Sequence, residues 1–185
     1  MSSRFALSVV TNIELPFEVS TFETAFGWFG LLGQAGRLLG IRIGHLRRSD
    51  VVPAFGKSYE LTTSEMIERD WQPNLATRLQ EYCSGAVDDF ADVEIFYFRK
   101  LPPFRSEVIK ATRRIPSGRT VSYLELAARA GSPKAARAVG NSMATNLFPI
   151  IVPCHRVVGS GGHLGGFTAP GGLNLKQRLL AMESR

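Results

Sequence analysis

The residues with the clearest potential for chemistry are Cys154 and His155, which stand side by side in the stretch IIVPCHRVVGSGG, residues 150–162. A free cysteine with a pKa of about 8.5 is only slightly ionised at neutral pH, so a nucleophilic thiol needs a base or a positive field close by. His155 can supply the base, and Arg156 adds positive charge. The stretch therefore predicts thiol chemistry at Cys154.

A histidine that acts as a base needs a carboxylate that fixes its tautomer and stabilises its protonated form. Only three acidic residues follow Lys100 in the chain, namely Glu107, Glu125 and Glu183. We expect the orienting carboxylate among these three.

The remaining cysteine and histidines indicate neither a disulfide framework nor a metal site. Cys83 is the only other cysteine, and the histidines at 45, 155 and 163 form no spacing with the cysteines that resembles a zinc site. We therefore expect reduced thiols, no metal and no cofactor.

Positive charge is concentrated in the second part of the chain. Residues 1–100 carry 10 Lys and Arg against 13 Asp and Glu, a balance of −3. Residues 101–185 carry 12 Lys and Arg against 3 Asp and Glu, a balance of +9. A fold needs no such concentration, whereas Lys and Arg that face phosphates provide most of the non-specific affinity for nucleic acid. The second part therefore predicts a polyanionic partner.

Length and composition are those of a globular protein. The chain has 185 residues, of which 44% are hydrophobic, enough for a core in one ordinary domain or two small ones. Its longest apolar runs fall far short of the roughly 20 residues that a membrane span needs. The N-terminal sequence carries no export pattern. We expect a cytoplasmic protein, associated with the nucleoid if the source is bacterial, and no membrane partner.

The first part of the chain reads as strand-rich. Apolar and alternating patterns predict strands at residues 5–15, in a hairpin over 26–46 with its turn near Gly33 to Gly36, and at 93–100. Helical spacing extends over residues 64–85. The two prolines of LPPFRSE mark a boundary between a domain of residues 1–100 and one of residues 101–185.

The second part reads as mainly helical, which gives an α+β class for the whole chain. Helices are predicted over residues 106–118, 120–131, 132–146 and 174–185. Ser122 and Glu125 form a capping-box pattern, and Ser132 with Pro133 predicts the start of the third helix. The second and third helices, joined by a glycine turn, have the outline of a helix-turn-helix. The run FPIIVP, residues 148–153, predicts a short buried strand before the cysteine.

The segment around the cysteine also resembles a known family. The motifs are PCHRV at 153–157, Asn146 eight positions before the cysteine, ARAVG at 136–140 and IPSGRTVSY at 115–123. Together they resemble the active-site half of the O6-methylguanine-DNA methyltransferases. The likeness covers residues 95–185 closely, and the first half only in its strand-rich plan. It implies a ribonuclease-H-like α/β supporting domain over 1–100 and a DNA-binding, alkyl-transfer domain over 101–185.

The resemblance implies DNA repair by a single-turnover reaction in which Cys154 takes the alkyl group from guanine O6, with O4-alkylthymine left open as a second substrate. His155 would act as the base through a water, with Glu183 as its orienting carboxylate. Asn146 would hold the turn around the thiol. Tyr123 would donate its hydroxyl to guanine N3, so that the purine leaves as a neutral base.

The same resemblance assigns the pocket for the base. The carbonyl of Val157, with that of the cysteine, would accept hydrogen bonds from the exocyclic amine of guanine. In the family a backbone N–H from the following loop binds O6, but the loop here reads FTAPGG, and Pro170 has no N–H. We expect the N–H of Ala169 or Gly171 to substitute.

The implied partner is double-stranded DNA, bound through its minor groove by a monomer. Arg137 would fill the stack vacated by the flipped nucleotide, because the alkyl carbon cannot be reached in line inside the duplex. Tyr123 would crowd the flanking phosphate, and Lys134 adds positive charge. Small residues would let the third helix approach the groove closely, namely Ala135, Ala136, Ala138 and Gly140.

Three other functions fit part of the pattern. A non-enzymatic protein that binds or senses alkylation damage is the main alternative, but such relatives carry tryptophan where this chain has Cys154. A DNA-binding regulator would keep its function after Cys154→Ala. A cysteine hydrolase would not usually draw its base from the next residue, and no hydrolase motif accompanies the pair.

Overall fold

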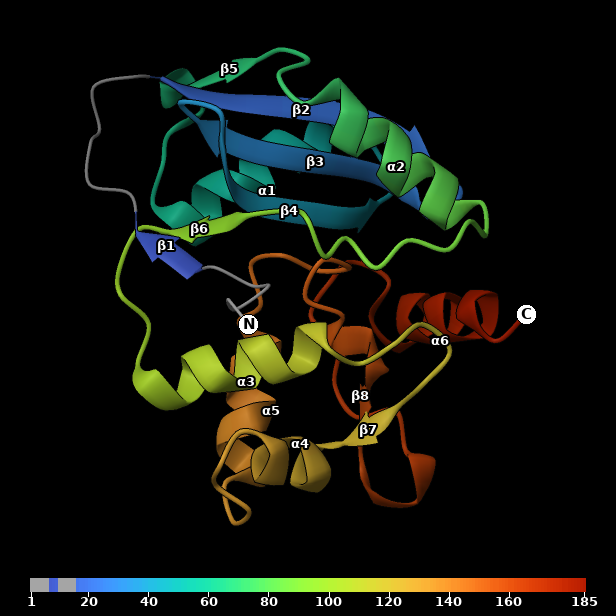
Figure 1. The fold of residues 1–185 in the computed structure, drawn as a ribbon. Coiled ribbons are helices and arrows are strands. Elements are labelled where there is room, and N and C mark those ends of the chain that lie inside the picture. Colours follow the sequence, from blue (N-terminus) through green and yellow to red (C-terminus); the bar gives the residue numbers. More distant parts are fainter. Residues whose placement is uncertain (1–6, 10–15) are drawn as a thin grey trace.

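The structure is a computed structural model that describes residues 7–9 and 16–185. A β-sheet with two helices makes up most of the first half of the chain, and a group of helices follows it (Figure 1). This arrangement confirms the predicted α+β class. Within the described residues, no helix is both long and apolar enough to cross a membrane.

The main sheet has four strands in the order β4-β3-β2-β5. The strands are β2 (Phe17–Thr24), β3 (Gly27–Gln34), β4 (Arg37–His45) and β5 (Met66–Glu68). β3 and β4 form the predicted antiparallel hairpin, whose turn is Ala35 and Gly36. Both turn residues have positive φ, at 52° and 73°, a conformation that glycine adopts without strain.

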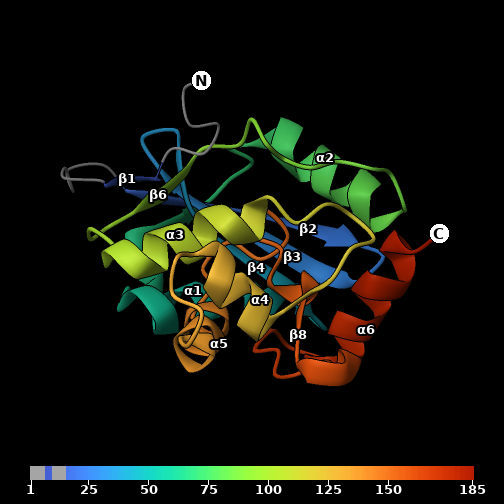
Figure 2. The same ribbon diagram turned by 60° about the horizontal axis from the view of Figure 1, so that its bottom comes forward.

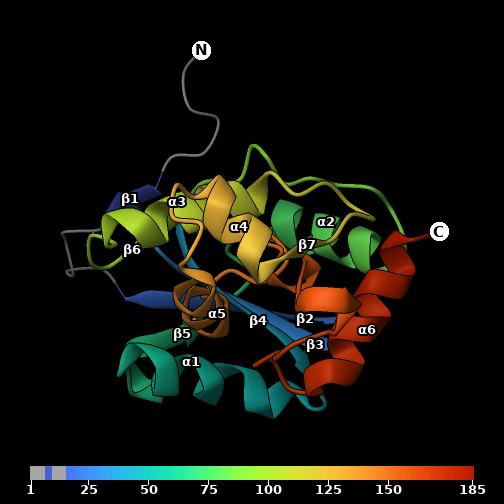
Figure 3. The same cartoon turned by 90° about the horizontal axis from the view of Figure 1, so that it is seen from below.

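Helices cover both faces of this sheet (Figure 3). They are α1 (Val51–Tyr59) and α2 (Pro73–Cys83). Successive strand residues point to opposite faces, so Leu31 packs in the apolar cluster that includes α2, and Leu32 in the cluster that includes α1. Burial on both sides explains why these strands read as apolar runs.

Two predictions for the first half need correction. The helix expected over residues 64–85 begins only at Pro73, because residues 63–65 form a 3₁₀ turn and the next three form β5. Helix α1 was not predicted. The strand expected at 93–100 is shorter, β6 (Ile95–Tyr97). It pairs in parallel with β1 (Leu7–Val9), the only described part of the strand expected at 5–15, since residues 5, 6 and 10–15 lie outside the described residues.

The second half is mainly helical, as predicted (Figure 2). Its elements are α3 (Pro103–Arg113), β7 (Val121–Ser122), α4 (Tyr123–Arg129), α5 (Ala136–Ala144), β8 (Val157–Val158) and α6 (Gly172–Glu183). β7 and β8 pair in parallel. The prolines of the expected boundary begin α3, because proline is tolerated at the first helical position.

The α4–α5 pair has the predicted cap but a later second helix. Ser122 Oγ accepts from Glu125 N at 3.1 Å, and Glu125 Oε2 accepts from Ser122 N at 2.8 Å, which confirms the capping box. The prediction that α5 starts at Ser132 and Pro133 is wrong. Residues 132–135 form a turn closed by a hydrogen bond from Ala135 N to Ser132 O at 2.9 Å, and the helix begins after it.

The segment FPIIVP is a buried turn, so the predicted strand is wrong. Val152 N donates to Phe148 O at 2.8 Å, and Ile150 has a φ of 76°. Among the described residues, its one ladder contact is an isolated bridge between Pro149 and Val152. All six residues are buried, and an apolar run by itself does not distinguish a buried strand from a buried turn.

The two halves of the chain share one apolar core. A cluster of buried residues joins β3, β4 and α2 to the buried turn and to Leu175 and Leu179 of α6. A second cluster draws only on residues of the second half and contains Cys154. The thiol therefore lies next to the junction of the two halves.

Candidate active site

Cys154 follows the buried turn directly and opens a 3₁₀ turn that ends at Arg156. The Asn146 side chain closes the buried turn at both ends. Its Nδ2 donates to Val152 O at 2.8 Å, and its Oδ1 accepts from Phe148 N at 3.0 Å. The same Nδ2 lies 3.1 Å from Cys154 Sγ. Asn146 therefore fixes the turn and the thiol together.

The thiol is protonated at rest. Burial raises the pKa of Cys154, and the hydrogen bond from Asn146 and the positive charge of Lys176 offset this only in part. Lys176 is buried in α6, and its Nζ donates to Val157 O at 2.7 Å. Burial lowers the pKa of Lys176 to about 8. The thiol therefore needs a base to become a nucleophile.

His155 and Glu183 form a buried pair, with Nε2 and Oε1 2.9 Å apart and each side chain 1% exposed. Burial alone would raise the pKa of Glu183, but hydrogen bonds from His155 and Arg156 outweigh it and hold the pKa well below its usual range. An ionised carboxylate only accepts hydrogen bonds, so Nε2 carries the proton of the imidazole. Burial lowers the pKa of His155, which keeps the ring neutral. Its Nδ1 has no partner among the described residues and can accept a proton.

Three further groups hold the Glu183 carboxylate. Arg156 donates to it from Nη2 at 2.6 Å and from Nε at 3.0 Å. Tyr82 Oη donates to Oε1, and Gly118 N donates to Oε2 at 3.2 Å. Arg156 also donates from Nη1 to Ile115 O at 2.6 Å. The sequence pointed to neither Tyr82 nor Gly118, and Tyr82 brings α2 of the first half into contact with the site.

The thiol borders a cavity of about 570 Å³. Of the residues predicted around the thiol and the base, Asn146, Cys154 and Ala169 line it, whereas Val157 and Gly171 do not. The N–H groups of Ala169 and Gly171 have no hydrogen-bond partner in the part of the chain that the structure describes. Both are therefore free to donate to a ligand.

Tyr123 is the first residue of α4 and packs against the cluster that contains Cys154 and Val157. It does not line the cavity. Burial raises the pKa of Tyr123, and ionisation of Cys154 raises it further, so the hydroxyl is protonated at neutral pH and can donate. A Cβ on Gly165 would lie 2.7 Å from Tyr123 Oη, and Gly165 has a φ of 65°. The loop after the cysteine thus needs glycine where it passes the tyrosine.

The residues predicted to contact DNA lie on α5 and on the turn before it. Lys134, Arg137 and Ala138 are exposed, and Ala135, Ala136 and Gly140 are half-buried. A Cβ on Gly140 would meet no atom within 4 Å, so this part of the helix surface is open. The structure does not bring these residues into contact with the thiol.

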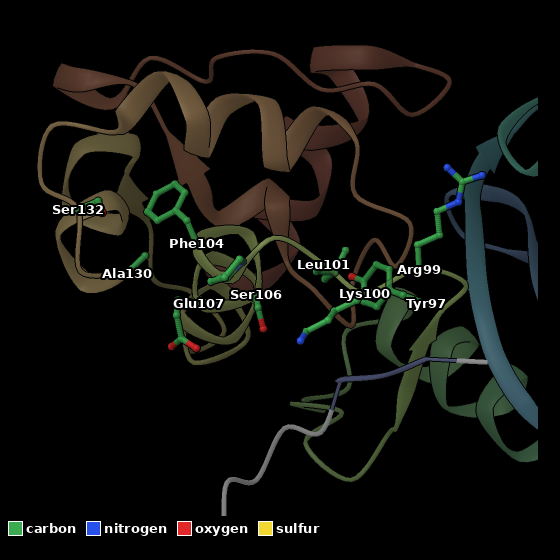
Figure 4. A pocket seen from close by; sticks show the side chains of 10 residues that line it. Tyr97, Arg99, Lys100, Leu101, Phe104, Ser106, Glu107, Ala130 and Ser132 are labelled. Atoms are coloured by element: carbon green, nitrogen blue, oxygen red, sulfur yellow. The ribbon is translucent and has the colours of Figure 1, made fainter. Parts of the chain in front are cut away.

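A second hollow of about 530 Å³ lies where α3 meets the end of β6 and the α4–α5 turn. Figure 4 shows Arg99 and Lys100 on one side of it and Phe104 and Ser132 on the other. It shares no lining residue with the cavity beside Cys154. Neither hollow offers a metal site, since the described residues contain no suitable group of three or more His, Cys, Asp or Glu.

Comparisons with known proteins identify the family of the chain. The family model for the 6-O-methylguanine DNA methyltransferase, DNA binding domain, matches residues 103–185. The methylated-DNA–protein-cysteine methyltransferase of Mycolicibacterium paratuberculosis is 36% identical over 143 residues, which cover 70% of this chain and 84% of that protein. The constitutive enzyme of this name from Bacillus subtilis is 43% identical over 108 residues, which cover 57% of this chain and 64% of that protein.

The fold is also similar to a solved structure over most of its length. The crystal structure of Mycobacterium tuberculosis OGT in complex with DNA has a TM-score of 0.73 and 33% sequence identity. The match covers 90% of this chain and 92% of that one. Sequence and fold agree, and the chain belongs to the methylated-DNA–protein-cysteine methyltransferase family.

Proposed function

We propose that the protein repairs duplex DNA by moving the alkyl group of O6-alkylguanine onto its own Cys154. The observation that carries this proposal is the arrangement at the thiol. Asn146 Nδ2 lies 3.1 Å from Sγ, and His155, the next residue in the chain, forms a buried pair with Glu183 of α6. Relatives named for cysteine methyl transfer from methylated DNA support the same reaction. O4-alkylthymine is left open as a second substrate.

The transfer is an in-line displacement at the alkyl carbon. The Cys154 thiol passes its proton through a water to His155 Nδ1, and Glu183 stabilises the imidazolium that forms. The Sγ–C bond forms as the C–O6 bond breaks, and the electron pair of that bond stays on the guanine. Because the thioether product is stable, each chain acts once.

The leaving purine has to take up a proton, and we assign the donor to the Tyr123 hydroxyl, at N3. The His155 imidazolium returns a proton to the tyrosinate through solvent, so the thiol proton is balanced by the one that the guanine gains. The hydroxyl is protonated at neutral pH, since burial raises the pKa of Tyr123, and is therefore present as a hydrogen-bond donor. The N–H of Ala169 or Gly171 is assigned to O6. The Val157 carbonyl is assigned to the exocyclic amine. It already accepts from Lys176, and a carbonyl oxygen can accept a second hydrogen bond.

On the DNA side, α5 is assigned to the minor groove. Arg137 would fill the gap left by the flipped nucleotide, and its exposure supports this role. Residues 101–185 would bind DNA and accept the alkyl group, with residues 1–100 as support. A monomer suffices, because one chain supplies every group assigned here.

Recovery of guanine in the DNA tests this proposal. A duplex with one O6-methylguanine is incubated with excess protein and digested, and its nucleosides are quantified. Wild type and Cys83→Ala should restore guanine, whereas Cys154→Ser should bind the duplex without repairing it. Repair by Cys154→Ser would overturn the assignment. Binding without repair by the wild type would indicate a protein that only recognises the damage.

A further inference from the structure

The cavity beside the thiol reaches into the first half of the chain. Its wall near Cys154 comes from residues 144–147, Pro149 and residues 167–170. Another wall comes from β4 and α1, with Ile41, Arg42, Ile43, His45, Lys57 and Ser58. Tyr123 and Val157, which are assigned to N3 and the exocyclic amine of the base, do not line it, whereas Ala169, a candidate donor to O6, does. The cavity is therefore placed to receive what is attached to the reacting carbon.

The size of the cavity exceeds what a methyl group needs. Its volume of about 570 Å³ lies within the range of about 300–1,000 Å³ that is usual for small-molecule sites. A methyl group on Sγ would leave most of this space unfilled. Larger alkyl groups can therefore extend from the thiol toward β4 and α1.

The wall formed by β4 and α1 is cationic. Arg42 is half-buried, donates to Ala54 O at 3.2 Å and Ile41 O at 2.9 Å, and lies over the Phe55 ring at 5.0 Å. These neutral groups hold the guanidinium without cancelling its charge. Neither Arg42 nor Lys57 has a carboxylate partner among the described residues. No Asp or Glu lines the cavity.

His45 adds a polar group to the same wall without adding charge. It is 7% exposed, and its Nε2 has no hydrogen-bond partner in the described part of the chain. Burial lowers the pKa of His45; the charge of Asp50 opposes this shift, and the charge of Arg42 adds to it. The positive charge of the wall therefore comes from Arg42 and Lys57.

We propose that this wall is a specificity-determining subsite that favours O6-(carboxyalkyl)guanine over uncharged adducts of the same size. The inference rests on the proposed function and deepens it. Sγ attacks the first carbon of the adduct, and the C–O6 bond breaks with its electron pair on guanine. The rest of the alkyl chain lies in the cavity, where its carboxylate meets Arg42 and Lys57. Charge-assisted hydrogen bonds form there with a carboxylate and not with an amide of the same shape.

A matched pair of substrates tests this subsite. O6-(3-carboxypropyl)guanine and O6-(3-carbamoylpropyl)guanine are placed in the same duplex, with O6-methylguanine as the reference, and single-turnover rates are measured at low salt. We expect the acid to react about fivefold faster than the amide, the effect of one partly screened charge pair. The ratio should fall toward one in Lys57→Gln and in Arg42→Gln, and also with added salt.

The control variant is Arg47→Gln, which removes an exposed positive charge close to His45 in sequence but outside the cavity lining. It should keep the acid-to-amide ratio of the wild type. Arg42→Gln also loses packing on the Phe55 ring. If that variant does not fold, the acid-to-amide ratio of Lys57→Gln, at an exposed position, tests the subsite.

The outcomes separate this inference from the proposed function. A wild-type ratio of one, or a ratio that Lys57→Gln keeps, overturns the subsite while methyl transfer still supports the repair reaction. Failure of the wild type to react with O6-methylguanine overturns the repair reaction itself, and the subsite with it.

Discussion

His155 Nε2 lies 2.9 Å from Glu183 Oε1, and the two side chains are buried together at the junction of the 3₁₀ turn and α6. Because Arg156 also binds this carboxylate, Glu183 stays ionised and can only accept. The proton of the imidazole is thereby fixed on Nε2, and Nδ1 is left as the basic nitrogen. The imidazole is thereby held in the tautomer that the proposed role as a base requires.

Glu183→Gln should slow alkyl transfer by roughly 100-fold, as loss of an orienting carboxylate does elsewhere. An amide can donate to Nε2, which would move the imidazole proton to Nδ1 and remove the base. Single-turnover rates at saturating DNA measure the effect, with circular dichroism to confirm folding. The control is Glu107→Gln, on the exposed side of α3. A folded Glu183→Gln protein with the wild-type rate would rule out the orienting role.

Stability should fall as the pH is lowered from about pH 7.5 to about pH 5. The pKa of His155 is lowered from 6.5 by burial, so below 6.5 the unfolded chain binds a proton that the folded protein does not. This contribution to the free energy of unfolding is present above pH 6.5 and is lost as the pH falls below that value. The lowered pKa of Glu183 has the same sign, with its loss beginning only below 4.5.

Urea denaturation at a series of pH values measures this dependence. His155→Gln should reduce the slope of the free energy of unfolding against pH between pH 7.5 and pH 5. The pKa of His45 is also lowered by burial, so His45 accounts for part of the slope that remains. His163→Gln, at an exposed loop position, should leave it unchanged. A free energy of unfolding with the same slope in His155→Gln would contradict a buried neutral imidazole.

Asn146→Ala should destabilise the protein by about 2 kcal/mol, because it leaves the buried Val152 O and Phe148 N without their partner. It should also raise the pKa of Cys154, since the Asn146 hydrogen bond lowers it. Chemical denaturation and the pH dependence of thiol reaction with iodoacetamide measure the two effects. Asn141→Ala, at an exposed position of α5, is the control. An unshifted thiol profile would show that Asn146 does not act on the sulfur.

Arg137→Ala should slow repair of duplex DNA about tenfold more than reaction with free O6-methylguanine, because only the duplex requires a flipped nucleotide. Arg129→Ala, another exposed arginine of the helix pair, should affect both substrates equally. The comparison uses single-turnover rates on the two substrates. If Arg137→Ala lost the same fraction of its rate on both substrates, Arg137 would not fill the gap left by the flipped nucleotide.

Short sequence patterns correctly predicted the elements that depend on neighbouring residues. The capping box at Ser122 and Glu125 and the hairpin turn of β3 and β4 depend on neighbouring residues only, and both are found. α1 was missed because Pro53 and Gly56 weaken its helical pattern. The buried turn before the cysteine was read as a strand because its apolar residues are buried in either structure.

The site residues also divide into those that local sequence indicates and those that only tertiary packing brings together. Cys154 and His155 are neighbours in sequence, and spacing within α6 places Lys176 on the same face as Glu183, a signal that could have identified the lysine. Tyr82 gave no such signal. Its contact with Glu183 spans 101 positions and exists only because α2 packs near α6 in the shared core. Contacts of this kind depend on tertiary packing and cannot be deduced from periodicity.

The most direct test of alkyl transfer to the thiol is intact-mass analysis followed by peptide mapping, after the protein is mixed with a duplex that contains one O6-methylguanine. The proposed reaction predicts a gain of one methyl group per chain, found on the peptide that holds Cys154 and not on the one that holds Cys83. A protein that binds the lesion and keeps its original mass would contradict it.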